Sequence, residues 1–337
     1  GEVRNNGTPV QKNRTHFRKF AAGADIDLSR FRTGSGTSLD GMGLSIRAYG
    51  GTQVFDQTFS AVSSDRNSEN LVRLQRVPSQ FVGFSARFTA AVNNQALLGG
   101  FETREVRGSS NENGFFGGNA TSRIGSGGRE RTYGIYFQDF IKVGEKLVLI
   151  GNIRFDFWRN HRGLRTLVLI SSNQKTTTIF PERSESSISP GGSVLLRVTD
   201  RVSLYGNASR SFRAPTLNEL YRGFRVGSII TDPNEELKAE KALNFEGGSS
   251  FSSKGFYLRG NFYWTEVSDS IANVTVNSTS SLIFRQRQNA GKVRVNGFEV
   301  EAETIFNGFG LKIGYLLSNA KFHDFPANRN VEGLRVP

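Results

Sequence analysis

The stretch "FYLRGNFYWT", residues 256–265, alternates between two kinds of side chain. Its even-numbered positions hold Phe, Leu, Gly, Phe and Trp, and its odd-numbered positions hold Tyr, Arg, Asn, Tyr and Thr. Successive side chains of a β-strand point to opposite faces of the sheet, so a period of two indicates a strand with one apolar and one polar face. We therefore predict a strand here whose two faces meet different surroundings.

The same alternation recurs along the chain, and helical periodicity is scarce outside residues 234–243. Thirteen strands are expected, near 14–30, 42–50, 52–62, 80–92, 95–106, 130–142, 146–158, 187–199, 202–213, 242–252, 256–270, 291–306 and 310–322. In the strand at 291–306 the apolar positions change from odd to even at Asn296-Gly297. An extra residue would absorb that change of phase, so we predict a β-bulge there.

Two kinds of connection alternate between these strands. Short turns are expected at 49–53, 92–95, 142–146, 199–202, 252–255 and 307–310, and long polar segments at 63–79, 107–129, 159–186, 214–241 and 271–290. Outer-membrane β-barrels place short turns at one end and long loops at the other. The pattern therefore predicts an all-β fold, an antiparallel transmembrane β-barrel with its apolar faces toward lipid. We expect the long segments from 107–129 onward to be exposed at the cell surface.

Composition limits the chemistry of the chain. Its 337 residues include no cysteine and only three histidines, which excludes disulfides and Cys/His clusters for zinc or iron–sulfur. The formal net charge is +13, but no dense Lys/Arg block appears, which argues against a nucleic-acid partner. No apolar run reaches the ~18 residues of a transmembrane helix. Because His16, His161 and His323 belong to no recognisable catalytic set, we expect no enzyme activity, no metal site and no cofactor.

The polar faces of the strands would line the interior of the barrel. Charges at this density need water or a polar partner, so we predict a wide lumen that is water-filled or plugged. The candidates for contact with a ligand or a plug are Arg154, Asp156, Arg213, Glu246, Arg259, Glu299 and Glu301. For Arg213 a structural ion pair is favoured. Glu299, Glu301 and Glu303 follow one another about 6–7 Å apart on one face, where contacts with arginines or a plug are favoured over a metal site.

Four stretches carry a family resemblance. "SRSFRAPTLNELY" (209–221) resembles a barrel corner of TonB-dependent outer-membrane receptors, and "YGIYFQDFIKVGEKLVLIGNIRFD" (133–156) resembles a strand pair of that family. "DPNEELKAEKALNFEGG" (232–248) is similar to its Asn-Pro-x-Leu stretch, and "NAGKVRVNGFEVEAE" (289–303) to its Asn-Ala-Gly-Lys strand. The stretches occur in the order that the family shows. The resemblance is good over 129–322, whereas residues 1–128 match only in strand-and-loop style.

The resemblance implies a 22-stranded barrel that is closed by an N-terminal plug domain and energised through the TonB protein. On that basis we expect residues 1–337 to supply about thirteen strands of a single barrel domain, with the plug and the C-terminal strands outside the chain. The implied function is active uptake of a scarce ligand across the outer membrane, such as a metal–siderophore chelate, a sugar or a peptide. The implied partners are membrane lipid, lipopolysaccharide, the TonB complex and a small-molecule ligand.

Pro215 should end the strand at 202–213, because proline has no N–H to donate to a ladder. The polar segment that follows would then be an outer loop. Candidates for ligand contact in this loop are Glu219, Tyr221, Arg222 and Arg225.

The choice of ligand stays open at this point. A haem receptor of the family would be expected to carry a histidine between the Phe-Arg-Ala-Pro and Asn-Pro-x-Leu stretches, and residues 216–231 contain none. The segment Asp232–Leu237 also departs from the family's pattern, so haem is disfavoured. Two other classes remain as alternatives, a passive porin-like channel and a β-rich adhesion module of the cell surface.

Overall fold

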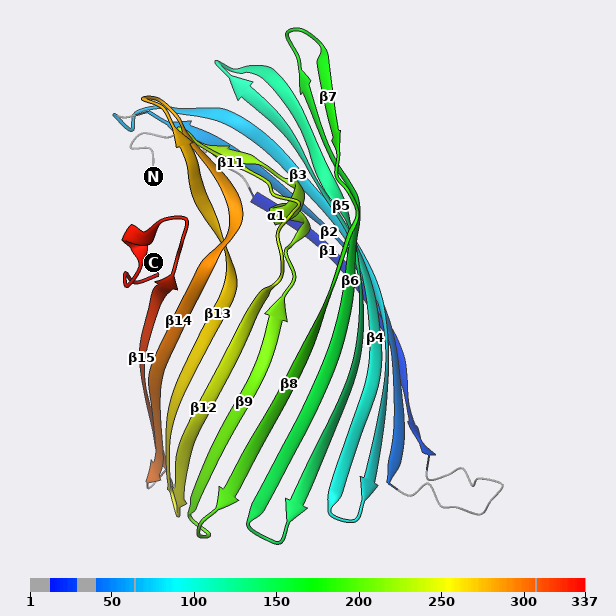
Figure 1. Cartoon of the computed structure of the whole chain (residues 1–337), viewed down its shortest axis with the longest axis vertical. Coiled ribbons are helices and arrows are strands. Elements are labelled where there is room, and N and C mark those ends of the chain that lie inside the picture. The colour runs from blue at the N-terminus through cyan, green and yellow to red at the C-terminus, as the bar shows by residue number, and fades with distance from the viewer. Residues whose placement is uncertain (1–12, 29–40, 64, 307, 337) are drawn as a thin grey trace.

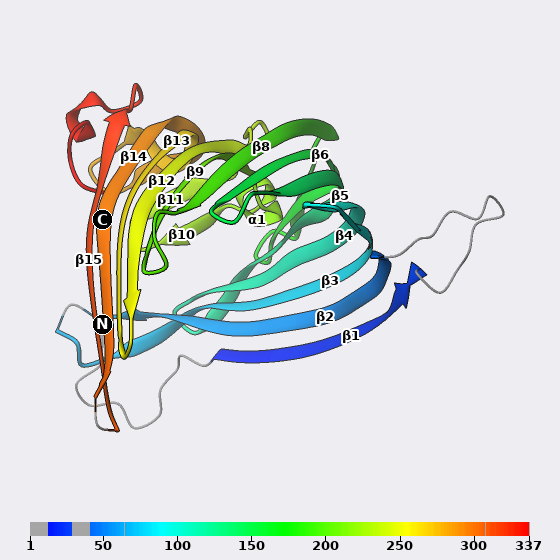
Figure 2. The same ribbon diagram turned by 90° about the horizontal axis from the view of Figure 1, so that it is seen from below.

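The chain forms one large, curved sheet. The computed structural model describes residues 13–28, 41–63, 65–306 and 308–336. Fifteen strands belong to the sheet, and its wall follows the order β1-β2-β3-β4-β5-β6-β8-β9-β12-β13-β14-β15 with antiparallel pairing throughout. The wall curls into an incomplete barrel whose two ends, β1 and β15, do not meet (Figures 1 and 2). The predicted fold class, a partial antiparallel β-barrel, is confirmed.

The strands are β1 (Asn13–Asp27), β2 (Met42–Val62), β3 (Glu69–Val92), β4 (Gln95–Phe116), β5 (Asn119–Val143), β6 (Leu147–Leu169), β7 (Gln174–Ile179), β8 (Arg183–Arg197), β9 (Val202–Arg213), β10 (Phe224–Val226), β11 (Ile229–Asp232), β12 (Glu240–Ser253), β13 (Phe256–Ser278), β14 (Ile283–Phe306) and β15 (Phe309–Asp324). Helix α1 (Leu217–Tyr221) and a 3-10 turn at Arg329–Val331 complete the described elements. Every predicted strand overlaps a strand of the wall, whereas β7, β10 and β11 were not predicted. Within the described ranges no helix is long and apolar enough to cross a membrane.

The two faces of the wall differ as the alternation predicts. Helix α1 lies on the concave face (Figure 2). The convex face carries a belt of exposed apolar side chains, among them Ile135, Phe155 and Phe262. Aromatic rings pack across neighbouring strands of this belt, with a centroid separation of 6.4 Å between Tyr133 and Phe157. The convex belt can therefore face an apolar solvent, while the concave face remains polar.

The predicted turn at 49–53 is wrong, because β2 runs unbroken from Met42 to Val62. Gly50 and Gly51, which suggested the turn, pair in the ladder with Val82 and Phe81 of β3. A side chain at Gly51 would come within 2.8 Å of the Phe81 ring. Glycine here leaves room for an aromatic ring inside a continuous strand.

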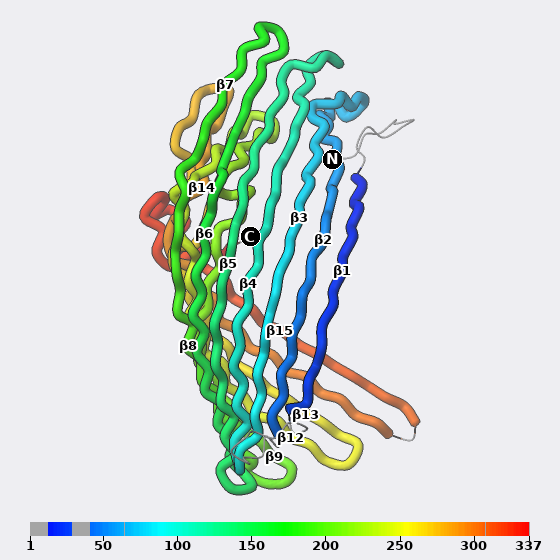
Figure 3. Tube along the Cα trace, turned by 90° about the vertical axis from the view of Figure 1, so that its right-hand side faces the viewer, coloured from blue at the N-terminus to red at the C-terminus, as the bar shows by residue number. Residues whose placement is uncertain are grey.

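The long segments between predicted strands are also mostly strand, except for 214–241. Residues 107–129, for example, form the upper part of the β4–β5 hairpin, which turns at Gly117-Gly118. Beyond the apolar belt both faces of such hairpins are polar, so the alternation that marks a strand disappears while the backbone ladder continues. Figure 3 shows these strands running side by side over the full height of the wall. The short turns gather at its opposite end (Figure 1).

The predicted bulge at Asn296-Gly297 is wrong as well. Both residues pair in register with Trp264 and Tyr263 of β13, and the register shifts of this strand pair instead lie between Val267 and Ile271 and between Thr275 and Asn277. Gly297 lies beneath the Tyr263 ring, which fills the space of the missing side chain. Three further tyrosines cover a directly opposite glycine on the concave face, in the pairs Tyr49–Gly83, Tyr136–Gly100 and Tyr205–Gly248. An aromatic ring across a strand glycine restores packing and helps to fix the register.

The prediction that residues 214–241 form an exposed outer loop is wrong. These residues fold back across the concave face. We call them the inward segment; it contains α1, β10 and β11 (Figure 2). Strand β11 pairs in parallel with the upper end of β14. Leu220, Tyr221 and Leu237 of the segment form a small core with Phe180, which lies in the connection between β7 and β8. This apolar core explains the inward position, because those side chains leave water only by packing against the wall.

Candidate functional site

Helix α1 begins where the Phe-Arg-Ala-Pro corner ends. The Thr216 hydroxyl accepts a hydrogen bond from the Glu219 backbone N–H at 3.2 Å, and the Glu219 carboxylate accepts one from the Thr216 N–H at 2.7 Å. This reciprocal pair is a capping box, which satisfies two backbone donors at the helix start. Arg213, the last residue of β9, donates to Glu219 at 2.9 Å and to Glu240 of β12 at 2.5 Å. The corner is therefore tied to the helix and to the wall at once.

The charge of Glu219 is stabilised within this corner. Burial disfavours the ionised carboxylate, but hydrogen bonds from Arg213 and from Thr216 more than offset that effect and hold the pKa of Glu219 below its usual value. The hydrogen bonds that Arg213 donates to the Glu240 and Glu219 carboxylates in turn raise the pKa of Arg213. The ion pair therefore stays charged at neutral pH.

Tyr221 at the end of α1 fits a smooth patch of the wall. Its ring is 1% exposed and lies over Gly128 of β5 and Gly163 of β6, where an added Cβ would be 2.6 Å from the ring. The Phe180 ring packs against it with a centroid separation of 5.1 Å. Burial raises the pKa of Tyr221 to about 12. The glycines therefore make the seat in which the helix docks.

A buried carboxylate holds the other side of the inward segment. Glu112 of β4 is 4% exposed and accepts hydrogen bonds from Arg222 at 2.5 Å, Ser110 at 2.9 Å and Gln75 at 3.2 Å. Arg73 of β3 approaches the second oxygen of Glu112 at 3.2 Å. One carboxylate thus joins an arginine of the segment to an arginine of the wall, and we call this group the Glu112 cluster.

Arg287 of β14 binds the inward segment on the side opposite the Glu112 cluster. Its guanidinium donates to the backbone carbonyls of Asn218 at 3.1 Å and Arg222 at 2.7 Å. It also lies 5.1 Å from the centre of the Phe224 ring, which Arg222 approaches at 5.7 Å. Burial and the nearby charge of Arg222 lower the pKa of Arg287. The inward segment is therefore held between β4 on one side and β14 on the other.

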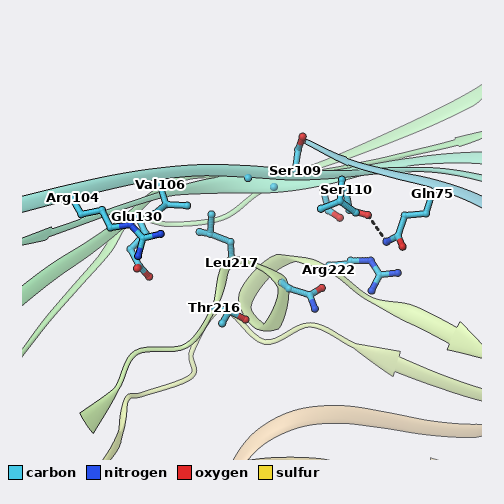
Figure 4. A pocket seen from close by; sticks show the side chains of 14 residues that line it. Gln75, Arg104, Val106, Ser109, Ser110, Glu130, Thr216, Leu217 and Arg222 are labelled. Atoms are coloured by element: carbon cyan, nitrogen blue, oxygen red, sulfur yellow. Dashed lines mark hydrogen bonds between the residues drawn. The ribbon is translucent and has the colours of Figure 1, made fainter. Parts of the chain in front are cut away.

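A cavity of about 490 Å³ lies between α1 and the inner surfaces of β3, β4 and β5 (Figure 4). Its polar lining includes Gln75, Arg104, Ser110, Ser126, Glu130 and Arg222, and Leu217, Val77 and Val106 add apolar surface. The buried Ser126 hydroxyl has no hydrogen-bond partner. Burial raises the pKa of Glu130. A hydrogen bond from Asn160 and the nearby charge of Arg104 partly offset this rise. A few polar groups in a mostly apolar hollow are typical of a small-molecule site.

The lumen residues predicted from the sequence are spread over the concave wall and do not line this cavity. Asp156 and Glu102 both bind Arg154. Arg259 donates to the Tyr205 hydroxyl at 3.0 Å and lies 3.9 Å from Glu246, and Glu301 pairs with Lys312. Glu299 lies on β14 opposite Asn261. The favoured structural ion pair of Arg213 is confirmed, while ligand or plug contact of the others stays a prediction.

Of the four predicted outer-loop residues, Arg222 alone lines the cavity. Glu219 caps the helix, Tyr221 is buried, and Arg225 is exposed, with its carbonyl accepting a hydrogen bond from Arg73. Sequence reasoning missed the wall residues of the site, among them Glu112, Glu130 and Ser126. The glycines and the serine at 125–128, within the long polar segment predicted at 107–129, were the available signal. Small residues in a strand often mark a close approach of another segment.

All three histidines lie outside this site. His16, His161 and His323 belong to β1, β6 and β15, and their alternation with concave neighbours places them on the convex face. Within the described ranges no group of three His, Cys, Asp or Glu side chains could hold a metal ion.

The glycine seat gives a direct test of how the inward segment docks. Gly163→Val should push the Tyr221 ring out of its seat, with an overpacking cost of about 1–3 kcal/mol. The chain lacks cysteine, so a single Ala239→Cys reporter, at a site 2% exposed, can be labelled with a thiol reagent in the full-length protein. We expect faster labelling in the Gly163→Val background. Gly151→Val is the matched control, because a side chain there meets nothing within 4 Å; equal rates in both backgrounds would contradict the seat.

Comparisons with known proteins agree on one architecture. The family model described as "TonB dependent receptor-like, beta-barrel" matches residues 2–337. The crystal structure of the ferric yersiniabactin uptake receptor FyuA from Yersinia pestis superposes with a TM-score of 0.72 at 15% identity, covering 99% of this chain and 46% of that one. The hemophore receptor HasR of Serratia marcescens gives 0.68 at 15% identity, covering 93% and 50%.

Curated relatives are found in sequence as well. "Heme/hemopexin utilization protein C" of Haemophilus influenzae is 25% identical over 211 residues, which is 53% of this chain and 27% of that protein. "Probable hemoglobin and hemoglobin-haptoglobin-binding protein 3" of the same species is 29% identical over 135 residues, covering 36% and 12%. In each of these matches the chain covers half or less of the other protein's length.

Proposed function

This chain belongs to the TonB-dependent receptor β-barrel family, and from that premise we propose that it forms part of the wall of an outer-membrane transporter for an iron compound, energised through TonB. The family is one of receptors and transporters. The curated relatives are named for haem or haemoglobin, which supports an iron compound over a sugar or a peptide. The partners of the proposed transporter are a plug domain, the TonB complex, outer-membrane lipid with lipopolysaccharide, and the small-molecule ligand.

The cavity beneath α1 is the observation that carries this proposal. It opens on the concave face and offers a guanidinium from Arg104, hydroxyls from Ser110 and Ser126, and the Gln75 amide. Ferric chelates present carboxylate, hydroxamate or catecholate oxygens, which such donors can bind. We therefore propose an anionic ferric chelate as the first candidate ligand, with Arg104 as its main charged contact.

Haem is the second candidate, because the curated relatives are named for it. Haem iron in proteins is bound by histidine, cysteine, methionine or tyrosine. The chain has no cysteine, its histidines lie on the convex face, and Met42 shares the face of Leu44 and Ile46. Among the described residues the concave face therefore offers tyrosines as axial ligands. A haem ligand held by this chain would show a tyrosinate absorption spectrum rather than a histidine one.

Growth of iron-starved cells tests the function. Cells that lack other receptors and express the full-length protein should grow on a ferric siderophore or on haemin, and this growth should disappear when TonB is removed. Growth that persists without TonB would indicate the passive porin-like channel instead. A protein recovered from the aqueous fraction without detergent would indicate the adhesion module.

A single substitution tests the ligand site. Arg104→Gln should raise the ligand concentration for half-maximal growth by about tenfold, the effect of losing one charge-assisted hydrogen bond. Arg76→Gln is the control, since Arg76 pairs with Asp56 at 3.1 Å on the convex face. Equal effects of the two substitutions would refute ligand contact at the cavity.

A further inference from the structure

The convex face carries a basic surface directly above its aromatic belt. The ladder places Thr103 of β4, Tyr133 of β5 and Phe157 of β6 in one row across three strands. Two residues further along the same strands, on the same face, the next row is Glu105, Arg131 and Arg159. The row after that is Arg107, Arg129 and His161. The change from aromatic to basic side chains is therefore abrupt and is shared by neighbouring strands.

The arginines of this surface outnumber the carboxylates that face them. Glu105 accepts a hydrogen bond from Arg131 at 2.8 Å and one from Arg129 at 3.4 Å, so one negative charge is divided between two guanidiniums. Arg159 pairs with Glu182, and both side chains are about half exposed. Arg107 extends the row toward β1, where Arg18 lies opposite Thr52. We call Arg18, Arg107, Arg129, Arg131 and Arg159 the convex arginine group.

The spacing of this group suits a phosphorylated headgroup. Neighbouring strands lie about 4.8 Å apart and same-face residues about 6.7 Å apart, so the guanidiniums of β4, β5 and β6 cover a patch roughly one nanometre wide, and Arg18 lies three strands beyond it. Two hollows, of about 610 and 350 Å³, open along it and share Arg107 and Arg129. Arginine binds phosphate through paired N–H donors in a fixed geometry. Several guanidiniums at this spacing can hold two phosphates together.

We propose that the convex arginine group binds the phosphates of a bis-phosphorylated glycolipid of the outer leaflet, whose acyl chains lie on the apolar belt below. The proposal rests on the outer-membrane location proposed above. The belt residues Tyr133 and Phe157 mark the level where acyl chains end, because aromatic side chains gather at membrane interfaces. The arginines begin one row beyond that level, which is where the headgroup phosphates of such a lipid would lie.

Other convex arginines do not share this arrangement and supply the control. Arg294 pairs with Glu266 at 2.7 Å and lies 5.5 Å from the Trp264 ring, and Arg76 pairs with Asp56. Each therefore has a carboxylate of its own. Their replacement changes the net charge of the convex face by the same amount without touching the group.

The test compares two double variants of the full-length protein purified from outer membranes. Arg107→Gln/Arg129→Gln should retain about tenfold less co-purified lipopolysaccharide, measured by mass spectrometry, because each lost guanidinium removes charge-assisted hydrogen bonds. Arg76→Gln/Arg294→Gln should retain as much as the parent. Heat-modifiable gel mobility shows that each variant is folded. Equal retention by both double variants would overturn the proposal.

Two further arms identify what is bound. Lipid A from which both phosphates have been removed should not rebind to delipidated protein; binding as tight as that of the phosphorylated form would overturn the proposal. Inorganic phosphate at millimolar concentration should not displace the lipid, and complete displacement would indicate a site for small anions instead. A protein absent from the outer-membrane fraction would refute the proposed location, whereas loss of lipid without loss of TonB-dependent growth would leave the proposed transport function intact.

Discussion

Glu112→Gln is expected to release the inward segment from the wall of the barrel. The substitution keeps the shape of the side chain but removes the charge that Arg73 and Arg222 share. Their side chains are only 17% and 16% exposed, so water cannot solvate these charges well once the carboxylate is gone. Leaving buried charges without their partner typically costs 3–5 kcal/mol. Transient opening of residues 214–241 should therefore become at least about a hundredfold more frequent.

Labelling of an Ala239→Cys reporter by a thiol reagent measures this opening in the full-length protein. The matched control is Glu301→Gln, which removes a carboxylate from the same concave face. Its partner Lys312 is 65% exposed, and an exposed ion pair contributes about 0–1 kcal/mol. Labelling should rise strongly in the first variant and little in the second. If the two variants label alike, Glu112 is not what holds the segment.

Phe262→Arg is expected to block assembly of the barrel. Phe262 is 53% exposed in the middle of the convex belt, so in the proposed membrane its side chain meets acyl chains. An arginine at the bilayer midplane of a β-barrel costs about 2–4 kcal/mol. The folded fraction of the full-length protein, measured by heat-modifiable gel mobility, should fall accordingly.

Asn207→Arg is the matched control, because it puts the same charge at the same depth on the opposite face. Phe262 pairs with Gly247 of β12. The neighbouring β12 residue, Glu246, points to the other face and pairs with Asn207. The new guanidinium would meet a carboxylate and water, and the main loss is the 2.9 Å hydrogen bond from Ser193. We expect about 1 kcal/mol for that loss. Equal damage from both substitutions would contradict the assignment of one face to lipid and the other to water.

Two errors in the sequence predictions share one cause. Gly50-Gly51 and Asn296-Gly297 were interpreted as a turn and a bulge, yet each lies in an unbroken ladder. In both places the missing side chain of a glycine leaves room for an aromatic ring of the neighbouring strand, Phe81 or Tyr263. The sequence shows that a side chain is missing but not which residue of another strand fills the space. That information depends on register, which is set only when the strands pair.

The sequence by itself determined the strands, their two faces, the positions of most short turns and the family. Alternation is a local property, since each residue's face follows from its parity and from the solvent that the face meets. Only the tertiary structure decided that residues 214–241 fold inward, that Gly128 and Gly163 seat Tyr221, and that Glu112 binds Arg222, 110 positions away. Such contacts depend on the curvature of the whole wall, which brings β4 and β14 to either side of one short helix. No window of sequence contains both partners, and for that reason the candidate site appeared only in the folded chain.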